Sequence, residues 1–144
     1  MTSQRLRRNA GQLEGVEVHE LALADRDEEV RFFSAEQGWA SSLEGDGRPV
    51  PVRGRTLDTL LDDLGLREVD LLKVDIEGSE FALIESQRLA DIGVIIGELP
   101  DRGSSGRRAR FFSALHGFDL NVRGGIGEHT TFLATRRSRA APYP

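Results

Sequence analysis

The strongest constraint on the fold is the alternation of helical and strand-like patterns over residues 56–135. Leucine repeats at helical spacing within residues 57–64, between a capping residue, Thr56, and a glycine at which the helix can end, Gly65. The mostly apolar run 69–75 then predicts a strand that is covered on both faces. Such alternation predicts an α/β fold with a mostly parallel sheet and helices on both of its faces.

The same patterns predict the remaining elements: helices over 2–15, 77–89 and 107–116, and strands over 16–23, 30–33, 50–53, 93–99, 118–122 and 130–135. A glycine-rich loop separates the last two strands, which predicts a C-terminal antiparallel hairpin. Residues 136–144 are basic and contain two prolines. We therefore expect one domain over residues 1–135, followed by a disordered tail.

Composition narrows the functional classes. The chain has no cysteine, which excludes disulfides, thiolate metal sites and a cysteine nucleophile. A net charge of −5 argues against nonspecific binding of nucleic acid. No apolar run approaches the roughly 20 residues of a membrane span, and no apolar segment follows the N-terminal arginines as in a signal peptide. We expect a soluble cytoplasmic protein without nucleic-acid or membrane partners.

The carboxylates that follow the strand 69–75 are the most informative candidates for chemistry, because ligands bind beyond the carboxyl ends of parallel strands. Asp75 lies where that strand ends and could accept a hydroxyl proton from a substrate or hold a ligand ammonium. An acid ending a buried strand would otherwise need a partner. Glu77 and Glu80 could instead favour the positive N-terminus of the following helix.

Three further residues are candidates at the same edge. Asp25 follows the strand 16–23 and could face a ligand or stabilise a turn. Glu98 lies near the end of the strand 93–99, where it could orient a substrate or form an ion pair. His129 lies in the late glycine-rich loop, and of the three histidines it is the best candidate for an acid or base.

Asp75, Glu77 and Glu80 could also form an oxygen-ligand site for magnesium or calcium. No second motif completes the coordination shell, so we predict no metal site. A magnesium-dependent hydrolase that uses these three carboxylates remains an alternative.

Two sequence blocks resemble the FkbM-type methyltransferase family. They are Thr-Leu-Asp at residues 56–58 and Leu-Leu-Lys-Val-Asp-Ile-Glu-Gly-Ser-Glu at residues 71–80, and the similarity extends over roughly residues 5–135. The resemblance implies a class I, Rossmann-like fold. It also implies an enzyme that uses S-adenosylmethionine to methylate a hydroxyl oxygen of a small molecule or sugar.

The resemblance implies that Asp75 lies beside the reacting centre, as a contact to the methyl donor or as a base. It also implies that Asp25 faces the adenine amine. The candidate cofactor-binding residues are therefore Asp25, Asp75 and Glu77, and the candidate catalytic residues are Asp75, Glu98 and His129.

The chain departs from the family in lacking an initial strand, a glycine-rich turn and a second strand that ends in an acid. The glycines at 124, 125 and 127 lie between two late strands, with no helix after them. We therefore expect a fold without its first strands and an exposed apolar edge at residues 69–75. Either residues 16–23 or another chain would cover that edge. The alternative function is an inactive methyltransferase remnant that serves as an interaction or structural module.

Overall fold

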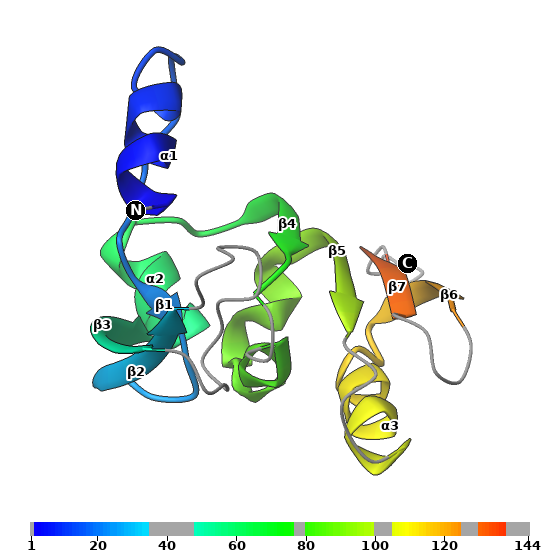
Figure 1. Cartoon of the computed structure of the whole chain (residues 1–144). Helices are drawn as coiled ribbons and strands as arrows, with labels where there is room; N and C mark the ends of the chain where they lie inside the picture. The colour runs from blue at the N-terminus through cyan, green and yellow to red at the C-terminus, as the bar shows by residue number, and fades with distance from the viewer. Residues whose placement is uncertain (1, 35–47, 77–79, 100–104, 125–129, 138–144) are drawn as a thin grey trace.

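The computed structural model describes residues 2–34, 48–76, 80–99, 105–124 and 130–137. Figure 1 shows two groups of strands and a helix, α1, that projects away from them. The elements in chain order are α1 (Thr2–Ala10), β1 (Ala22–Leu23), β2 (Glu29–Ser34), β3 (Arg48–Arg55), α2 (Leu57–Asp63), β4 (Val69–Val74), the 3₁₀ helices η2 (Glu80–Glu85) and η3 (Gln87–Asp91), β5 (Ile92–Leu99), α3 (Ser105–Ala114), β6 (Phe118–Arg123) and β7 (Thr130–Arg136).

The strands form two mixed sheets, with strand orders β1-β3-β2 and β4-β5-β7-β6. Parallel pairing joins β1 to β3 and β4 to β5, whereas β2–β3, β5–β7 and β6–β7 are antiparallel. The predictions of an α/β chain and of a C-terminal antiparallel hairpin are confirmed. The prediction of a mostly parallel sheet is wrong, because among the described strands three pairs are antiparallel and two are parallel. Parallel neighbours need a crossover connection, whereas β6 and β7 follow each other directly along the chain.

Helix α2 forms as its sequence predicts. The Thr56 hydroxyl accepts a hydrogen bond from the backbone N–H of Thr59 and so caps the helix. Leu57 and Leu61 are buried in the core. Gly65 has a φ of 66°, the left-handed conformation that favours glycine after a helix.

Two other predicted elements differ from the structure. Residues 80–91 form η2 and η3 instead of one α-helix, because Ser86 has an extended backbone and its hydroxyl accepts from the N–H of Arg88, which starts a new turn. The predicted strand 16–23 is reduced to β1, which pairs with β3. Val16 is 47% exposed and therefore has little packing to hold an extended strand.

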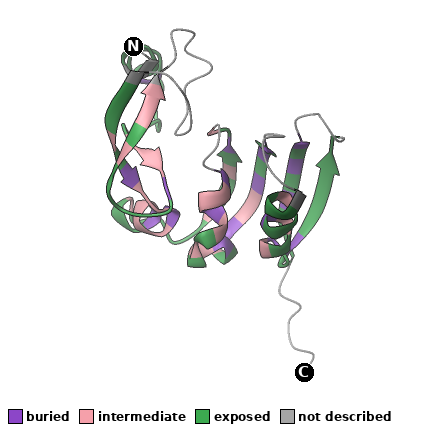
Figure 2. Ribbon diagram, turned by 60° about the horizontal axis from the view of Figure 1, so that its bottom comes forward, coloured by how far each residue is buried: buried purple, intermediate pink, exposed green. Residues whose placement is uncertain are grey.

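The four-stranded sheet is covered by helices on one face. Leu72, Ile95 and Phe132 belong to a core shared with η2, η3 and α3, and Figure 2 shows the buried residues in purple where helices meet strands. On the opposite face Leu71 and Ile96 are 58% and 41% exposed. The prediction that both faces are covered is therefore wrong for the described residues.

Strand β4 lies at the edge of its sheet. Within the described ranges no strand pairs with its outer side, so the predicted open edge is confirmed. The alternative in which residues 16–23 cover that edge is wrong, because β1 pairs with β3 instead. Coverage by another chain stays a prediction.

At the C-terminal end, β7 includes Arg136, and the backbone N–H of Arg137 donates to the carbonyl of Gly117. Residues 138–144 of the predicted tail lie outside the described residues. None of the described helices combines the length and apolar character that a membrane span requires.

Candidate functional site

Strands β4 and β5 bring two of the predicted site residues together. The register pairs Val74 with Gly97, so the next residues along the parallel strands, Asp75 and Glu98, lie side by side. Residues two apart share a face, which places Lys73 on the same side as Asp75. The Lys73 Nζ atom lies 2.6 Å from Asp75 Oδ2, and both side chains are more than half exposed. We call Lys73, Asp75 and Glu98 the β4–β5 rim.

The geometry of this rim depends on Gly97. A Cβ atom at that position would lie 2.6 Å from the Val74 carbonyl oxygen, closer than real Cβ contacts come. Glycine therefore lets β5 approach β4 beside Glu98. No ion pair joins Glu98 to any residue in the described part of the chain, which leaves its carboxylate available to a ligand.

Asp25 lies elsewhere, on one wall of an open pocket of about 880 Å³. One wall consists of the turn after β1 and the start of β2, and the other consists of η2 and the first turns of α3. Asp25 Oδ1 lies 3.7 Å from Arg26 Nε. The residues that line the pocket include neither Asp75 nor Glu98. The structure therefore separates Asp25 from the β4–β5 rim.

The other predicted site residues are not brought to the rim. Glu77 and His129 lie outside the described residues. Glu80 begins η2 and is only 2% exposed, so it is buried rather than solvated. No group of three or more potential metal ligands occurs among the residues that the structure describes.

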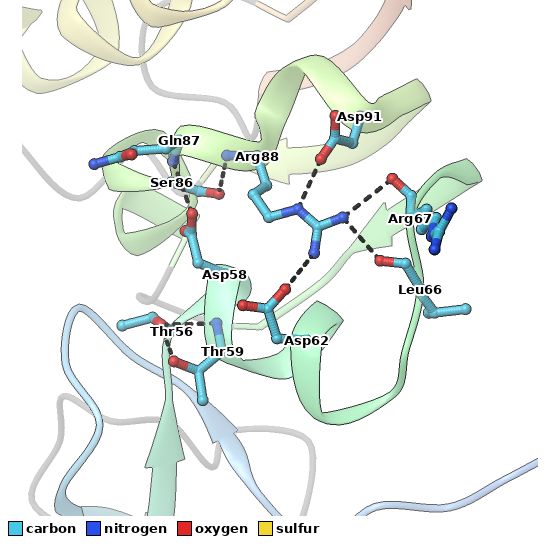
Figure 3. A network of polar contacts seen from close by, with 10 residues as sticks. All are labelled: Thr56, Asp58, Thr59, Asp62, Leu66, Arg67, Ser86, Gln87, Arg88 and Asp91. Atoms are coloured by element: carbon cyan, nitrogen blue, oxygen red, sulfur yellow. Dashed lines mark hydrogen bonds and ion pairs between the residues drawn. The ribbon is translucent and has the colours of Figure 1, made fainter.

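The Thr-Leu-Asp block lies in a network of hydrogen bonds that joins three segments (Figure 3). Asp58 Oδ1 accepts from the backbone N–H of Gln87 at 3.1 Å. Arg88 donates to Asp62 and Asp91, each at 2.7 Å, and to the carbonyls of residues 66 and 67. The hydrogen bond to Asp91 is the main reason that the pKa of Arg88 is raised. The network thus ties α2 and the segment before β4 to η3.

Asp27 connects this network to the pocket wall. It accepts from the Thr59 hydroxyl at 2.7 Å and from the backbone N–H of Thr56 at 3.0 Å. These two hydrogen bonds are the main reason that the pKa of Asp27 is lowered. Sequence reasoning missed both Asp27 and Arg88, because the contacts that join them to other segments are distant in sequence: Asp27 meets Thr56 and Thr59, 29 and 32 residues away, and Arg88 meets Asp62, 26 residues away.

Comparison with known proteins agrees with the two sequence blocks. The family described as Methyltransferase FkbM domain matches residues 4–120. Among curated proteins, the AMB antimetabolite synthetase AmbE of Pseudomonas aeruginosa is 34% identical over 79 residues, which cover 49% of this chain and 4% of that protein. No solved structure matches the chain. Because the family match spans well over half of the 144 residues, the protein belongs to the FkbM methyltransferase domain family.

Proposed function

We propose that this chain binds S-adenosylmethionine and serves in methyl transfer to a hydroxyl oxygen of a small molecule or sugar. Membership of the FkbM methyltransferase family supports this proposal. When bound, the cofactor supplies a methyl group on a positively charged sulfur, which an oxygen nucleophile can displace in line. The protein then has to position the acceptor and remove its proton.

The residues of the open pocket fit an adenosyl group. Asp25 offers a carboxylate that can accept a hydrogen bond from an adenine amine. Phe33 also lines the pocket and is half-buried, so it offers ring surface to a planar base. Asp25 and Phe33 are therefore the residues that we expect to hold the cofactor.

The β4–β5 rim supplies the acid–base chemistry in this proposal, and the observation that carries it is the pairing of Lys73 with Asp75 beside Glu98. Lys73 holds one carboxylate oxygen of Asp75, which fixes the side chain and leaves Oδ1 to accept the proton of the acceptor hydroxyl. Glu98 can orient that hydroxyl by accepting a hydrogen bond from a neighbouring donor group of the acceptor molecule.

Substitution of Asp75 tests this role. Radiolabelled S-adenosylmethionine and a panel of sugar and small-molecule alcohols would measure methyl transfer. We expect Asp75→Asn to lower the rate about 10²–10⁴-fold, the usual contribution of a general base. Asp70→Asn is the matched control, because Asp70 is exposed on the same strand but points to the other face. Equal rates for the two variants would contradict the role of Asp75.

Calorimetry with S-adenosylhomocysteine tests cofactor binding separately. We expect measurable heat from the unmodified chain and weaker binding by Asp25→Asn, with Asp70→Asn again as the control. Absence of heat at millimolar ligand would favour the inactive remnant, an interaction or structural module, over the enzyme.

A further inference from the structure

The open pocket has two walls of different chemistry. Glu29, Arg31 and Phe33 alternate on β2 and therefore point to one face of that strand, toward the pocket that all three line. The opposite wall presents Phe81 and Ile84 of η2, both half-buried. A ligand in the pocket would thus meet apolar surface on both sides and charged groups around it.

Two of the four arginines that line the pocket are already paired. Arg26 Nε lies 2.6 Å from Glu28 Oε1, and Arg110 Nη2 lies 2.6 Å from Glu85 Oε1. These carboxylates neutralise the two guanidinium groups and would compete with any anionic ligand for them.

The other two, Arg31 and Arg107, form no ion pair with a described carboxylate, and it is Arg107 that packs against an aromatic ring. Its Cζ atom lies 5.3 Å from the centre of the Phe81 ring, in a cation–π contact. No carboxylate among the described residues forms an ion pair with Arg107. A guanidinium that packs against a ring keeps its N–H groups in its own plane, and those that do not face the ring can bind a carboxylate or phosphate through two hydrogen bonds.

We propose that this pocket binds an organic anion, with its apolar body against Phe81 and Ile84 and its carboxylate or phosphate on Arg107. This inference goes beyond the proposed methyl transfer and does not assign the anion as the acceptor, because neither Asp75 nor Glu98 lines the pocket. The apolar wall and the charged group lie next to each other, so one small molecule can reach both. A neutral sugar would leave the Arg107 guanidinium without a partner.

Three matched probes test the proposal without a methyl donor: 4-hydroxybenzoate, 4-hydroxyphenyl phosphate and the neutral 4-hydroxybenzamide. Titration followed by the NMR signals of the arginine Nε–H groups measures binding at Arg107. We expect at least one anion to bind roughly tenfold or more tightly than the amide, the scale of a charge-assisted hydrogen bond. The tighter anion identifies the head group, carboxylate or phosphate.

Arg107→Gln should lower the affinity for the anion to that for the amide and leave the amide unaffected. Arg123→Gln is the control, because Arg123 is also exposed but lies on β6, outside the pocket lining. Equal binding of all three probes, or an equal loss in both variants, would overturn the proposal.

A competition experiment separates this anion site from the cofactor site. If saturating S-adenosylhomocysteine leaves anion binding intact, the two ligands occupy different sites. If it displaces the anion, the two ligands share one site and the proposal of a separate anion site is wrong. If S-adenosylhomocysteine does not bind at all, the proposed enzymatic function fails, whereas the anion site is still decided by the three probes and by Arg107→Gln.

Discussion

Asp58 and Asp75, one from each of the two sequence blocks typical of the family, lie in different physical environments. In the first block, Thr56 caps α2, Leu57 is 3% exposed in the core, and Asp58 accepts a backbone N–H at the start of η3. In the second, Lys73 and Asp75 form an exposed pair at the rim of a sheet.

The first block is explained by folding alone, because each of its polar groups has a structural partner and its leucine is buried. The exposed ion pair of Lys73 and Asp75 contributes little to the free energy of unfolding, since surface ion pairs are worth about 0–1 kcal/mol. A sequence motif can therefore combine residues that stabilise the fold with residues whose side chains are accessible to a ligand. The exposed fraction of each side chain distinguishes the two kinds.

The largest effect is expected at the centre of the first block. Leu57→Ala should lower the free energy of unfolding by about 2–5 kcal/mol, because it leaves a cavity in the core. Leu71→Ala, at a position that is 58% exposed, should change it by less than about 0.5 kcal/mol. Urea denaturation of both variants measures the difference. Similar losses would show that burial does not distinguish the two blocks.

A smaller effect is expected at the helix cap. Thr56→Ala should lower the free energy of unfolding by about 0.5–2 kcal/mol, because the N–H of Thr59 loses its acceptor. Thr56→Ser keeps the hydroxyl and should recover most of the loss. If serine and alanine are equally destabilising, the methyl group rather than the cap is responsible.

The pH dependence of stability tests the contacts of Asp27. Folding lowers its pKa, so the ionised carboxylate stabilises the native state above the unfolded value of about 3.9. That contribution is lost as the pH falls through this value toward the lower pKa of the folded state. Asp27→Asn should therefore lose less stability than the unmodified chain on acidification, whereas Asp70→Asn should follow the unmodified chain. The free energy of unfolding, measured by urea denaturation at each pH, gives the three curves. Parallel curves for all three proteins would contradict a stabilising role of the ionised Asp27.

The smallest effect on stability is expected at the rim. Lys73→Met removes the partner of Asp75 and should change the free energy of unfolding by less than about 0.5 kcal/mol. Thermal denaturation measures it. A loss comparable to that of Thr56→Ala would mean that the rim also holds the fold.

Elements with local signals were predictable. The cap at Thr56, the spaced leucines and Gly65 lie within ten residues and specify α2. Strands β5, β6 and β7 followed from apolar runs and a glycine-rich turn. The predicted helix over 77–89 was wrong because Ser86 offers its own hydroxyl to the backbone, a local competitor that helical spacing does not reveal.

The candidate site was predictable only in part. Asp75 and Glu98 were expected at neighbouring strand ends, and they directly follow Val74 and Gly97, which pair in the parallel register of β4 and β5. Asp25 was expected near them, yet it lines a pocket between a turn and η2. The cation–π contact of Arg107 had no signal in the sequence, because it joins residues from two separate helices.

The amino-acid sequence alone determined the family, the capped helix α2 and the acid that ends a parallel strand, because each of these depends on residues close together in the chain. Only the tertiary structure decided that two mixed sheets form, that Leu71 stays exposed and that Arg107 has no carboxylate partner among the described residues. Burial and pairing depend on which distant segments meet. That choice minimises the free energy of the whole chain rather than of any one segment.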